Sequence, residues 1–141
     1  MVYTHGVLLL PPEALTAIVG HAFACLPEEA CGLLVGTVAT GEVVRFVPCR
    51  NVAASSKVYE LDGRDLLRTE RAAEEEGLEV VGVVHSHTHT EAYPSPTDVA
   101  QAPDPTWRYV IVSLKRDDPS TRAYRIVDGV VTEEPIVVPG T

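Results

Sequence analysis

Hydrophobic positions along the chain fall into short dense runs, separated by polar segments in which apolar residues recur at every third or fourth position. Dense runs rich in valine, isoleucine and aromatic residues are typical of strands, and the wider spacing is typical of amphipathic helices. The two patterns mix along the sequence, and tight turns separate some of the strand-like runs. This order predicts an α/β or α+β domain in which helices flank a mixed β-sheet.

Two segments have helical spacing: residues 12–26, which Pro12 opens, and residues 64–77, where Gly77 is placed as the C-cap. The dipeptide Asp128-Gly129, between two β-rich runs, is the strongest hairpin signal in the chain. The predicted strands lie at residues 7–10, 31–38, 42–48, 59–61, 78–87 and 107–114, and on either side of that turn within residues 121–138.

Length and composition narrow the class of protein. Residues 1–141 are enough for one domain with its own core, and no repeat or linker divides them. The net charge of -9 argues against a nucleic-acid partner, which would need clustered lysine and arginine. No apolar stretch reaches the roughly 20 residues of a membrane helix, and the N-terminus lacks the basic region of a signal peptide. Three cysteines without paired spacing fit a reducing compartment, so we expect a cytoplasmic protein.

Residues 85–98 combine histidines, prolines and an aspartate directly after a predicted strand. Because side chains two apart on a strand share a face, His85 and His87 would point the same way at its end. Two imidazoles side by side suit one metal ion, and a catalytic zinc takes about three protein ligands and a water. Asp98 can supply the third ligand if residues 88–94 return the chain to the strand end.

Each part of residues 85–98 can also be explained without a metal ion. Ser-Pro-Thr-Asp at residues 95–98 is a good helix start, with Ser95 as the N-cap and Pro96 at the first helical position. A His-x-His pair alone is common at exposed strand ends. The two features together favour the metal, and both readings can hold, because a helix cap would fix the direction of Asp98. His89 is expected to be an exposed loop residue.

Water activated by a metal needs a carboxylate that is not itself a ligand to take its proton. Glu28 and Glu29 lie immediately before the predicted strand at residues 31–38, whereas most other glutamates have the pattern of solvated surface groups. A carboxylate that enters an apolar strand is the better candidate for this base. The chemistry of the residues leaves the choice between Glu28 and Glu29 open.

Three short motifs together resemble the signature of the JAMM (MPN+) metalloproteases. That signature is Glu-x-x-Gly, followed by His-x-His, seven residues, and Ser-x-x-Asp. Here it reads Glu29-Ala-Cys-Gly32, then His85-Ser-His87, then Ser95-Pro-Thr-Asp98, with the same spacing. The segment NVAASSKVYELD at residues 51–62 is also similar to the bacterial members, so the resemblance covers nearly the whole chain.

The resemblance implies a JAMM/MPN-like fold of the cytidine-deaminase-like kind and a zinc metallopeptidase with one Zn2+ per chain. In the family pattern, His85, His87 and Asp98 would hold the zinc together with a water. The register of the signature selects Glu29 as the base. Ser95 would donate a hydrogen bond to the oxyanion that forms on the attacked carbonyl.

Two further segments are similar to the bacterial Mec type of this family: TEAYPSPTD at residues 90–98 and AYRIVDGVVTEEPI at residues 123–136. The Mec type hydrolyses cysteine adducts of sulfur-carrier proteins. The implied partner is therefore a ubiquitin-like carrier ending in Gly-Gly, and the implied reaction cleaves the amide between its last glycine and cysteine, in cysteine biosynthesis or related sulfur transfer. The alternatives are a JAMM isopeptidase that removes ubiquitin-like modifiers from lysine and a non-catalytic MPN scaffold. The side chains that recognise cysteine cannot be assigned from the sequence.

Overall fold

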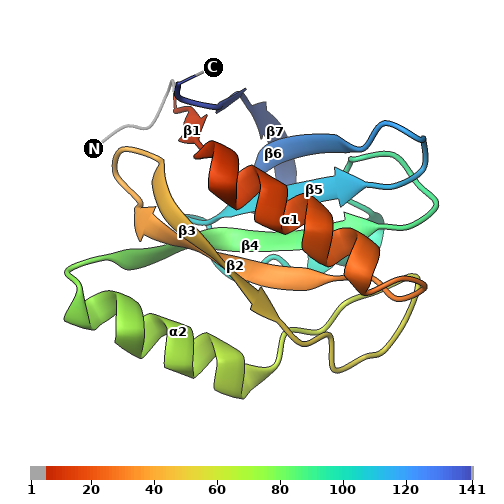
Figure 1. Cartoon of the computed structure of the whole chain (residues 1–141), viewed down its shortest axis with the longest axis horizontal. Helices are drawn as coiled ribbons and strands as arrows, with labels where there is room; N and C mark the ends of the chain where they lie inside the picture. The colour runs from red at the N-terminus through yellow and green to blue at the C-terminus, as the bar shows by residue number, and fades with distance from the viewer. Residues whose placement is uncertain (1–5, 141) are drawn as a thin grey trace.

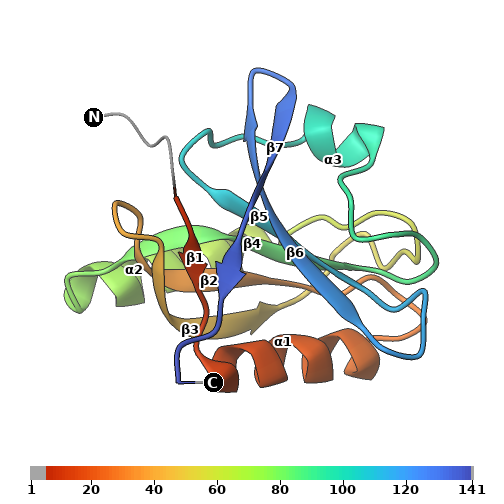
Figure 2. The same ribbon diagram turned by 90° about the horizontal axis from the view of Figure 1, so that it is seen from above.

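The computed structural model describes residues 6–140, which form a mixed β-sheet with helices on both sides (Figures 1 and 2). The sheet has eight strands in the order β7-β6-β5-β4-β2-β3-β1-β8. Strand β4 pairs antiparallel with β2 and parallel with β5. This architecture confirms the predicted α+β class.

Most element boundaries agree with the hydrophobic pattern to within a few residues. The strands are β1 (Leu8–Leu9), β2 (Cys31–Thr37), β3 (Glu42–Cys49), β4 (Glu79–His87), β5 (Arg108–Ser113), β6 (Ser120–Val127), β7 (Val130–Glu134) and β8 (Ile136–Val137). The helices are α1 (Pro12–Ala24), α2 (Gly63–Glu75) and α3 (Pro96–Ala100). Asp128 and Gly129 have φ angles of 51° and 78° and join β6 to β7 in the predicted hairpin. No helix within residues 6–140 is long and apolar enough to cross a membrane.

Two predicted strands differ from the structure. Residues 59–61 form no strand, because Leu61 makes only a single bridge to Asn51 and the Tyr59 ring stacks on a histidine instead. Pro135 divides the last predicted strand into β7 and β8, since proline lacks the N–H that a continuous ladder uses. Strand β7 pairs with β6, whereas β8 pairs with β1 at the other end of the strand order.

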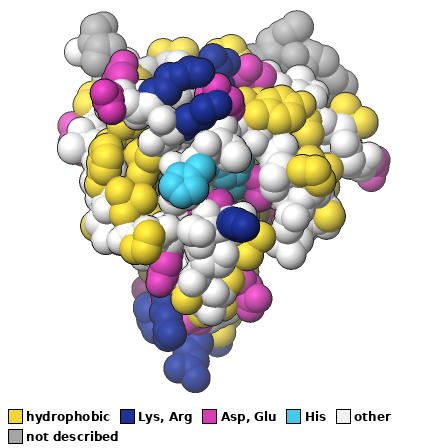
Figure 3. Space-filling view, turned by 90° about the vertical axis from the view of Figure 1, so that its right-hand side faces the viewer, with side chains coloured by type: hydrophobic (Ala, Val, Ile, Leu, Met, Phe, Trp, Pro, Cys, Tyr) yellow, Lys and Arg dark blue, Asp and Glu magenta, His cyan; other side chains and the backbone are white. Residues whose placement is uncertain are grey.

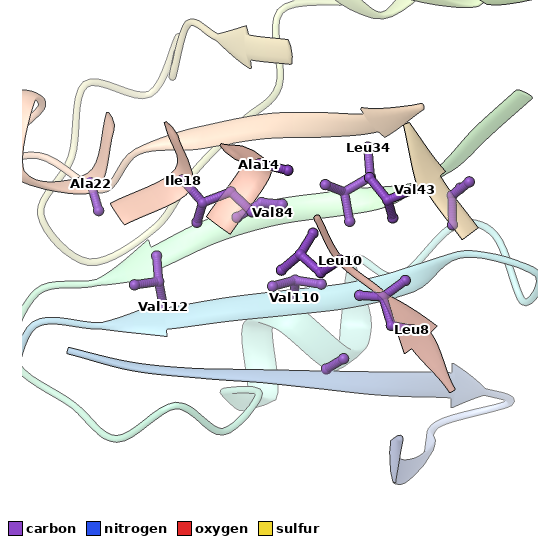
Figure 4. Close-up of a cluster of buried hydrophobic side chains, with 12 residues drawn as sticks. Leu8, Leu10, Ala14, Ile18, Ala22, Leu34, Val43, Val84, Val110 and Val112 are labelled. Carbon is purple, nitrogen blue, oxygen red and sulfur yellow. The ribbon is translucent and has the colours of Figure 1, made fainter. Parts of the chain in front are cut away.

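Each face of the sheet has its own apolar core. Helix α1 packs Ala14 and Ile18 against Val84, Val110 and neighbouring side chains on one face (Figure 4). On the opposite face, α2 and α3 cover a second cluster, built around apolar residues of β2, β4 and β5. Burying a side chain of this size contributes roughly 1.5–3 kcal/mol, so both faces of the central strands are fixed by packing.

The central strand β4 delivers both histidines to one face of the sheet. Val84 joins the core beneath α1, whereas Val83 packs toward α2 and α3. His85 and His87 lie on the side of Val83, because side chains two apart on a strand point the same way. The histidines therefore lie at the end of a strand that is buried from its second residue onward, on the face that carries α3.

A buried ion pair links two strands of the sheet that are not direct neighbours. Arg108 on β5 and Glu134 at the end of β7 are only 1% and 6% exposed, and Arg108 Nε donates to Glu134 Oε1 over 2.8 Å. Arg108 Nη1 also donates to the Val38 carbonyl, just beyond β2, over 2.7 Å. The guanidinium thus joins β5, β7 and the end of β2 immediately before the chain turns at Pro135.

Replacing Glu134 by alanine is expected to lower the free energy of unfolding by about 3–5 kcal/mol, because the Arg108 guanidinium would stay buried without its partner. Glu133→Ala is the matched control. Glu133 is adjacent in sequence but pairs with Arg122 at the surface, where a pair contributes about 0–1 kcal/mol. Urea unfolding followed by circular dichroism measures both variants, and equal losses would contradict a special role for the buried pair.

Candidate metal site

Three side chains that can bind a metal ion converge at the end of β4. His87 is the last residue of that strand, and His85 lies two positions before it. Asp98 belongs to α3. His85 Nε2 lies 3.1 Å from His87 Nε2, and Asp98 Oδ2 lies 3.1 Å from the first nitrogen and 3.0 Å from the second. The loop at residues 88–94 does return the chain to the strand end.

The short helix α3 fixes the direction of Asp98 through a capping box. Ser95 Oγ accepts a hydrogen bond from the Asp98 N–H over 3.1 Å, and the Ser95 N–H donates to Asp98 Oδ2 over 2.9 Å. Pro96 occupies the first helical turn, where its missing N–H costs nothing. The helix-start reading of residues 95–98 is therefore correct, and the cap aims Asp98 Oδ2 at the two histidines.

The triangle of ligand atoms fits a zinc ion in size and chemistry. Ligand bonds of about 2.0–2.1 Å in a tetrahedral site separate the ligand atoms by roughly 3.3 Å, close to the three separations given above. The side chains of His85, His87 and Asp98 expose only 2%, 4% and 11% of their surface. Two imidazoles and a carboxylate are common zinc ligands, and here they are withdrawn from water with their ligand atoms facing one another.

Neighbouring groups hold both imidazole rings in place. His87 Nδ1 donates to the Glu91 carbonyl over 2.7 Å, and because a carbonyl only accepts, the lone pair of a neutral ring is left on Nε2. The His85 ring stacks on Tyr59, with ring centroids 4.4 Å apart and planes inclined by 19°. Both rings therefore present Nε2 to the triangle without further rearrangement.

Burial and hydrogen bonding shift the pKa values of the three groups. Burial lowers the pKa of His85, which favours the neutral imidazole that a metal requires. Burial alone would raise the pKa of Asp98, but hydrogen bonds with His85 and His87 outweigh it and hold that pKa well below its usual range. For His87, burial acts to lower the pKa, and the hydrogen bonds with Asp98 and the Glu91 carbonyl raise it overall. Asp98 is consequently ionised, which is the form of a carboxylate that can bind a metal ion.

The structure separates the two candidate bases. Glu28 is exposed, whereas Glu29, two residues before β2, is 3% exposed. The Glu29 N–H donates to the Ser55 carbonyl over 2.8 Å, and the next N–H, of Ala30, donates to the Ser86 hydroxyl over 2.7 Å. Because Ser86 lies between the two histidines in sequence, these bonds tie the glutamate to the strand that carries the metal triangle.

Burial also sets the protonation of Glu29. It raises the pKa of this carboxyl to about 7, while the nearby His87 acts to lower the pKa and Asp98 acts to raise it. Glu29 Oε1 has no hydrogen-bond partner among the described residues. A carboxylate that is buried, incompletely hydrogen bonded and half protonated near neutral pH has the properties of a general base.

The remaining predicted residues lie at and beside the triangle. Ser95 is half-buried next to Asp98, and its oxygen accepts from the Asp98 N–H, which leaves the hydroxyl proton for another acceptor. His89 is exposed, as predicted.

The sequence analysis did not identify the role of residues 51–62, which cover the candidate site. Asn51 Nδ2 donates to the Glu29 carbonyl over 3.0 Å, and Tyr59 stacks on His85. The similarity of this segment to bacterial JAMM proteins was the available signal. Its contacts join residues far apart in the sequence, so the individual residues could not be selected from spacing.

Residues 11–127 match the family of prokaryotic homologues of the JAB domain, and the chain belongs to this family. It is 44% identical over 135 residues to the CysO-cysteine peptidase of Mycobacterium tuberculosis, covering 94% of this chain and 91% of that protein.

Two further relatives are more distant. A probable TtuB-protein conjugate cleaving protease of Thermus thermophilus is 34% identical over 127 residues, covering 89% of this chain and 80% of that protein. A solution structure of a protein from Desulfitobacterium hafniense superposes with a TM-score of 0.87 at 31% identity, covering 96% of this chain and 94% of the other.

Glu29→Gln is expected to stabilise the metal-free protein at alkaline pH. The pKa of Glu29 is about 7 in the folded protein and near 4.5 when solvated, so folding stability falls as pH rises between these values. At pH 8, in chelator, the variant should gain about 2–3 kcal/mol, and at pH 4 almost nothing. Chemical unfolding at both pH values measures the difference, with the exposed Glu28→Gln as control. An equal gain at pH 4, or the same gain in the control, would contradict a buried ionised Glu29.

Proposed function

We propose that this protein is a zinc-dependent metallopeptidase in which residues 1–141 act as a single JAMM/MPN+ domain. One observation supports the chemistry above all others: Glu29, with its raised pKa, is buried beside the converging His85, His87 and Asp98. A scaffold that only bound partners would not need a buried ionisable carboxylate next to a complete ligand set, which carries a cost in stability.

The proposed substrate is a ubiquitin-like sulfur-carrier protein whose C-terminal glycine is joined to cysteine through an amide. Water breaks the C–N bond, the carrier regains its carboxylate, and cysteine leaves with its amine. The similarity to the CysO-cysteine peptidase over 94% of the chain supports this substrate. The free thiols of Cys25, Cys31 and Cys49 agree with a reducing, cytoplasmic setting.

His85, His87 and Asp98 would hold the zinc in the triangle described above. Zinc, when bound, supplies a Lewis acid and makes a water molecule more acidic. The protein contributes ligands that are already oriented: the Glu91 carbonyl fixes the His87 ring, Tyr59 stacks on His85, and the capping box fixes Asp98. Such fixed surroundings reduce the rearrangement that metal binding requires.

The Glu29 carboxylate is placed to move the proton. It accepts a proton from the attacking water and passes it to the amide nitrogen, which leaves as a neutral amine. A base works best when its pKa is near the working pH. Burial brings the pKa of Glu29 to about 7 in the metal-free protein, and a bound Zn2+ nearby would favour the ionised form that accepts a proton. The Ser95 hydroxyl donates to the oxyanion on the carbonyl carbon, using the proton that its cap contact leaves available.

The nearest alternative is an isopeptidase that removes ubiquitin-like modifiers from lysine. The Thermus thermophilus relative, described as cleaving TtuB–protein conjugates, supports this second candidate. Both reactions break an amide after the C-terminal glycine of a carrier and can use the same metal site. They differ in the leaving amine, which is the α-amine of a terminal cysteine in one case and a lysine side chain in the other.

The purified protein should remove one cysteine from a ubiquitin-like carrier that ends in Gly-Gly-Cys, with complete loss of activity in excess chelator and recovery on adding Zn2+. Intact mass spectrometry follows the loss of one cysteine residue. A Gly-Gly-lysine isopeptide of the same carrier is incubated in parallel. Cleavage of the isopeptide at an equal rate would favour the modifier-removing protease, and cleavage of neither substrate by the zinc-loaded protein would contradict both proposals.

Substitutions should separate metal binding from catalysis. Asp98→Ala is expected to lose zinc on dialysis against a mild chelator, because it removes one of three ligands. Glu29→Gln and Ser95→Ala are expected to retain zinc, and the serine variant to lose about 10²–10³ in kcat. Zinc content by mass spectrometry and single-turnover rates measure both properties. Loss of zinc in the serine variant, or near-normal rates in Glu29→Gln, would contradict the assigned roles.

A further inference from the structure

The segment that connects β3 to α2 passes over the end of the sheet that carries the candidate metal site. In Figure 1 it lies on the right-hand side of the view, where β4 also ends. Figure 3 shows that side of the molecule, with histidine side chains near its centre and acidic side chains beside them. Two hydrogen bonds anchor the segment there. The Glu29 N–H donates to the Ser55 carbonyl over 2.8 Å, and Thr88 Oγ1 donates to the Ser56 carbonyl over 3.0 Å.

The register of the sheet places the proposed base opposite a residue of this segment. In the antiparallel ladder between β2 and β3, Cys31 pairs with Cys49. Continuing that register by two residues brings Glu29 opposite Asn51. The two main chains do not pair there as strands, and the Asn51 side chain makes the contact instead: its Nδ2 donates to the Glu29 carbonyl over 3.0 Å.

The register on the other side of β2 leads to the metal site. Cys31 pairs with His85 in the antiparallel ladder between β2 and β4. Continuing this register by two residues brings Glu29 opposite His87. The intermediate pair keeps the register, because the Ser86 N–H donates to the Ala30 carbonyl over 2.9 Å. Glu29 therefore has a candidate metal ligand on one side and the asparagine amide on the other.

The side-chain amide of Asn51 uses both of its donors and both acceptor positions. Besides the Glu29 carbonyl, Nδ2 reaches the Val58 carbonyl over 3.1 Å. Asn51 Oδ1 accepts from the N–H groups of Ala53 and Glu60 over 3.0 and 2.9 Å. An amide has two N–H donors and an oxygen with two lone pairs, so its capacity is filled. An ordinary turn formed by an asparagine would need only the contact with the N–H two residues on.

Two of these four bonds enclose the residue that covers the metal site. Asn51 bonds the Val58 carbonyl and the Glu60 N–H, which lie immediately before and after Tyr59. The Tyr59 ring stacks on His85 with centroids 4.4 Å apart. One amide thus connects the main chain of the proposed base to the main chain that holds an aromatic ring against a metal-site histidine.

Glu29 depends on its main chain for its position. Its Oε1 has no hydrogen-bond partner among the described residues, so no contact at that atom fixes the carboxylate. We propose that Asn51 is a positioning residue for the hydrolysis, which holds Glu29 opposite His87 and Tyr59 against His85. Asn51 itself touches neither of the reacting groups. This inference rests on the proposed function, since it concerns the placement of the base assigned there.

Asn51→Asp tests the donor side of the amide. It keeps the size and the acceptor oxygen of the side chain, but a second oxygen replaces Nδ2 and cannot donate to the Glu29 and Val58 carbonyls. The zinc-loaded variant should lose about 10²-fold in kcat with little change in KM, because a displacement of a catalytic group by about 1 Å has an effect of this size. Single-turnover and steady-state rates are measured on the better of the two carrier substrates described above, with zinc content and circular dichroism as checks.

Asp104→Ala is the matched control. Asp104 Oδ1 accepts from the Thr106 N–H over 2.8 Å, which is the same kind of contact, two residues on, that Asn51 makes with Ala53. The side chain of Asp104 has no hydrogen bond to the candidate site. This variant should keep the wild-type kcat. A loss in Asp104→Ala as large as that in Asn51→Asp would contradict a specific role for Asn51.

A double variant shows whether Asn51 acts through Glu29. In the Glu29→Gln background the base is already lost, so adding Asn51→Asp should slow single turnover little further. A general loss of structure would instead slow both backgrounds by the same factor. Asn51→Ser, which keeps one donor and one acceptor, should have a kcat between those of the wild type and Asn51→Asp. It carries the test if Asn51→Asp does not fold.

The outcomes separate this inference from the function on which it rests. A near-normal kcat in a folded, zinc-loaded Asn51→Asp, or in Asn51→Ser where only that variant folds, would overturn the positioning role while the hydrolase activity stands. Equal slowing in both backgrounds would overturn the action through Glu29. Cleavage of neither carrier substrate by the zinc-loaded wild-type enzyme would overturn the proposed function and this inference together.

Discussion

A single carboxylate oxygen, Oδ2 of Asp98, joins the two halves of the candidate site. It accepts from the Ser95 N–H at the start of α3 and faces Nε2 of both His85 and His87 at the end of β4. The start of a helix and the end of a strand are therefore held together at one atom. Because β4 is buried on both faces and the helix start is capped, folding alone brings the three candidate ligand atoms together.

Residues 51–62 cover the candidate site, and the burial that they cause lowers the stability of the folded protein when Glu29 is ionised. This segment holds Glu29 through main-chain and side-chain bonds, covers His85 with Tyr59, and excludes water from the carboxylate. The burial that raises the pKa of Glu29 also disfavours its ionised form in the folded protein. The large apolar cores on both faces of the sheet offset this local cost, which is a common relation between stability and activity.

Much of the fold was predictable because its signals are local. The Asp128-Gly129 hairpin, the end of α2 near Gly77 and the apolar run of β4 each follow from a few neighbouring residues. The prediction failed where contacts with residues far away in the sequence determine the local structure. Tyr59 was predicted to lie in a strand, but its ring packs on His85. Pro135 divides one predicted strand into two, which lie at opposite ends of the sheet.

The candidate site shows the same division. Spacing on a strand was enough to bring His85 and His87 together, and the cap pattern indicated how Asp98 would be held. The choice of Glu29 over Glu28 came from a resemblance, and its physical reason is burial beneath residues 51–62, which no local pattern shows.

The groups proposed for catalysis and the exposed residues beside them differ in how tightly the fold holds them. The former belong to a buried strand, a capped helix and the segment that leads into another buried strand, where substitutions disturb packing. Arg116 and Tyr93 lie on an exposed turn and loop, and their side chains can change without altering the sheet.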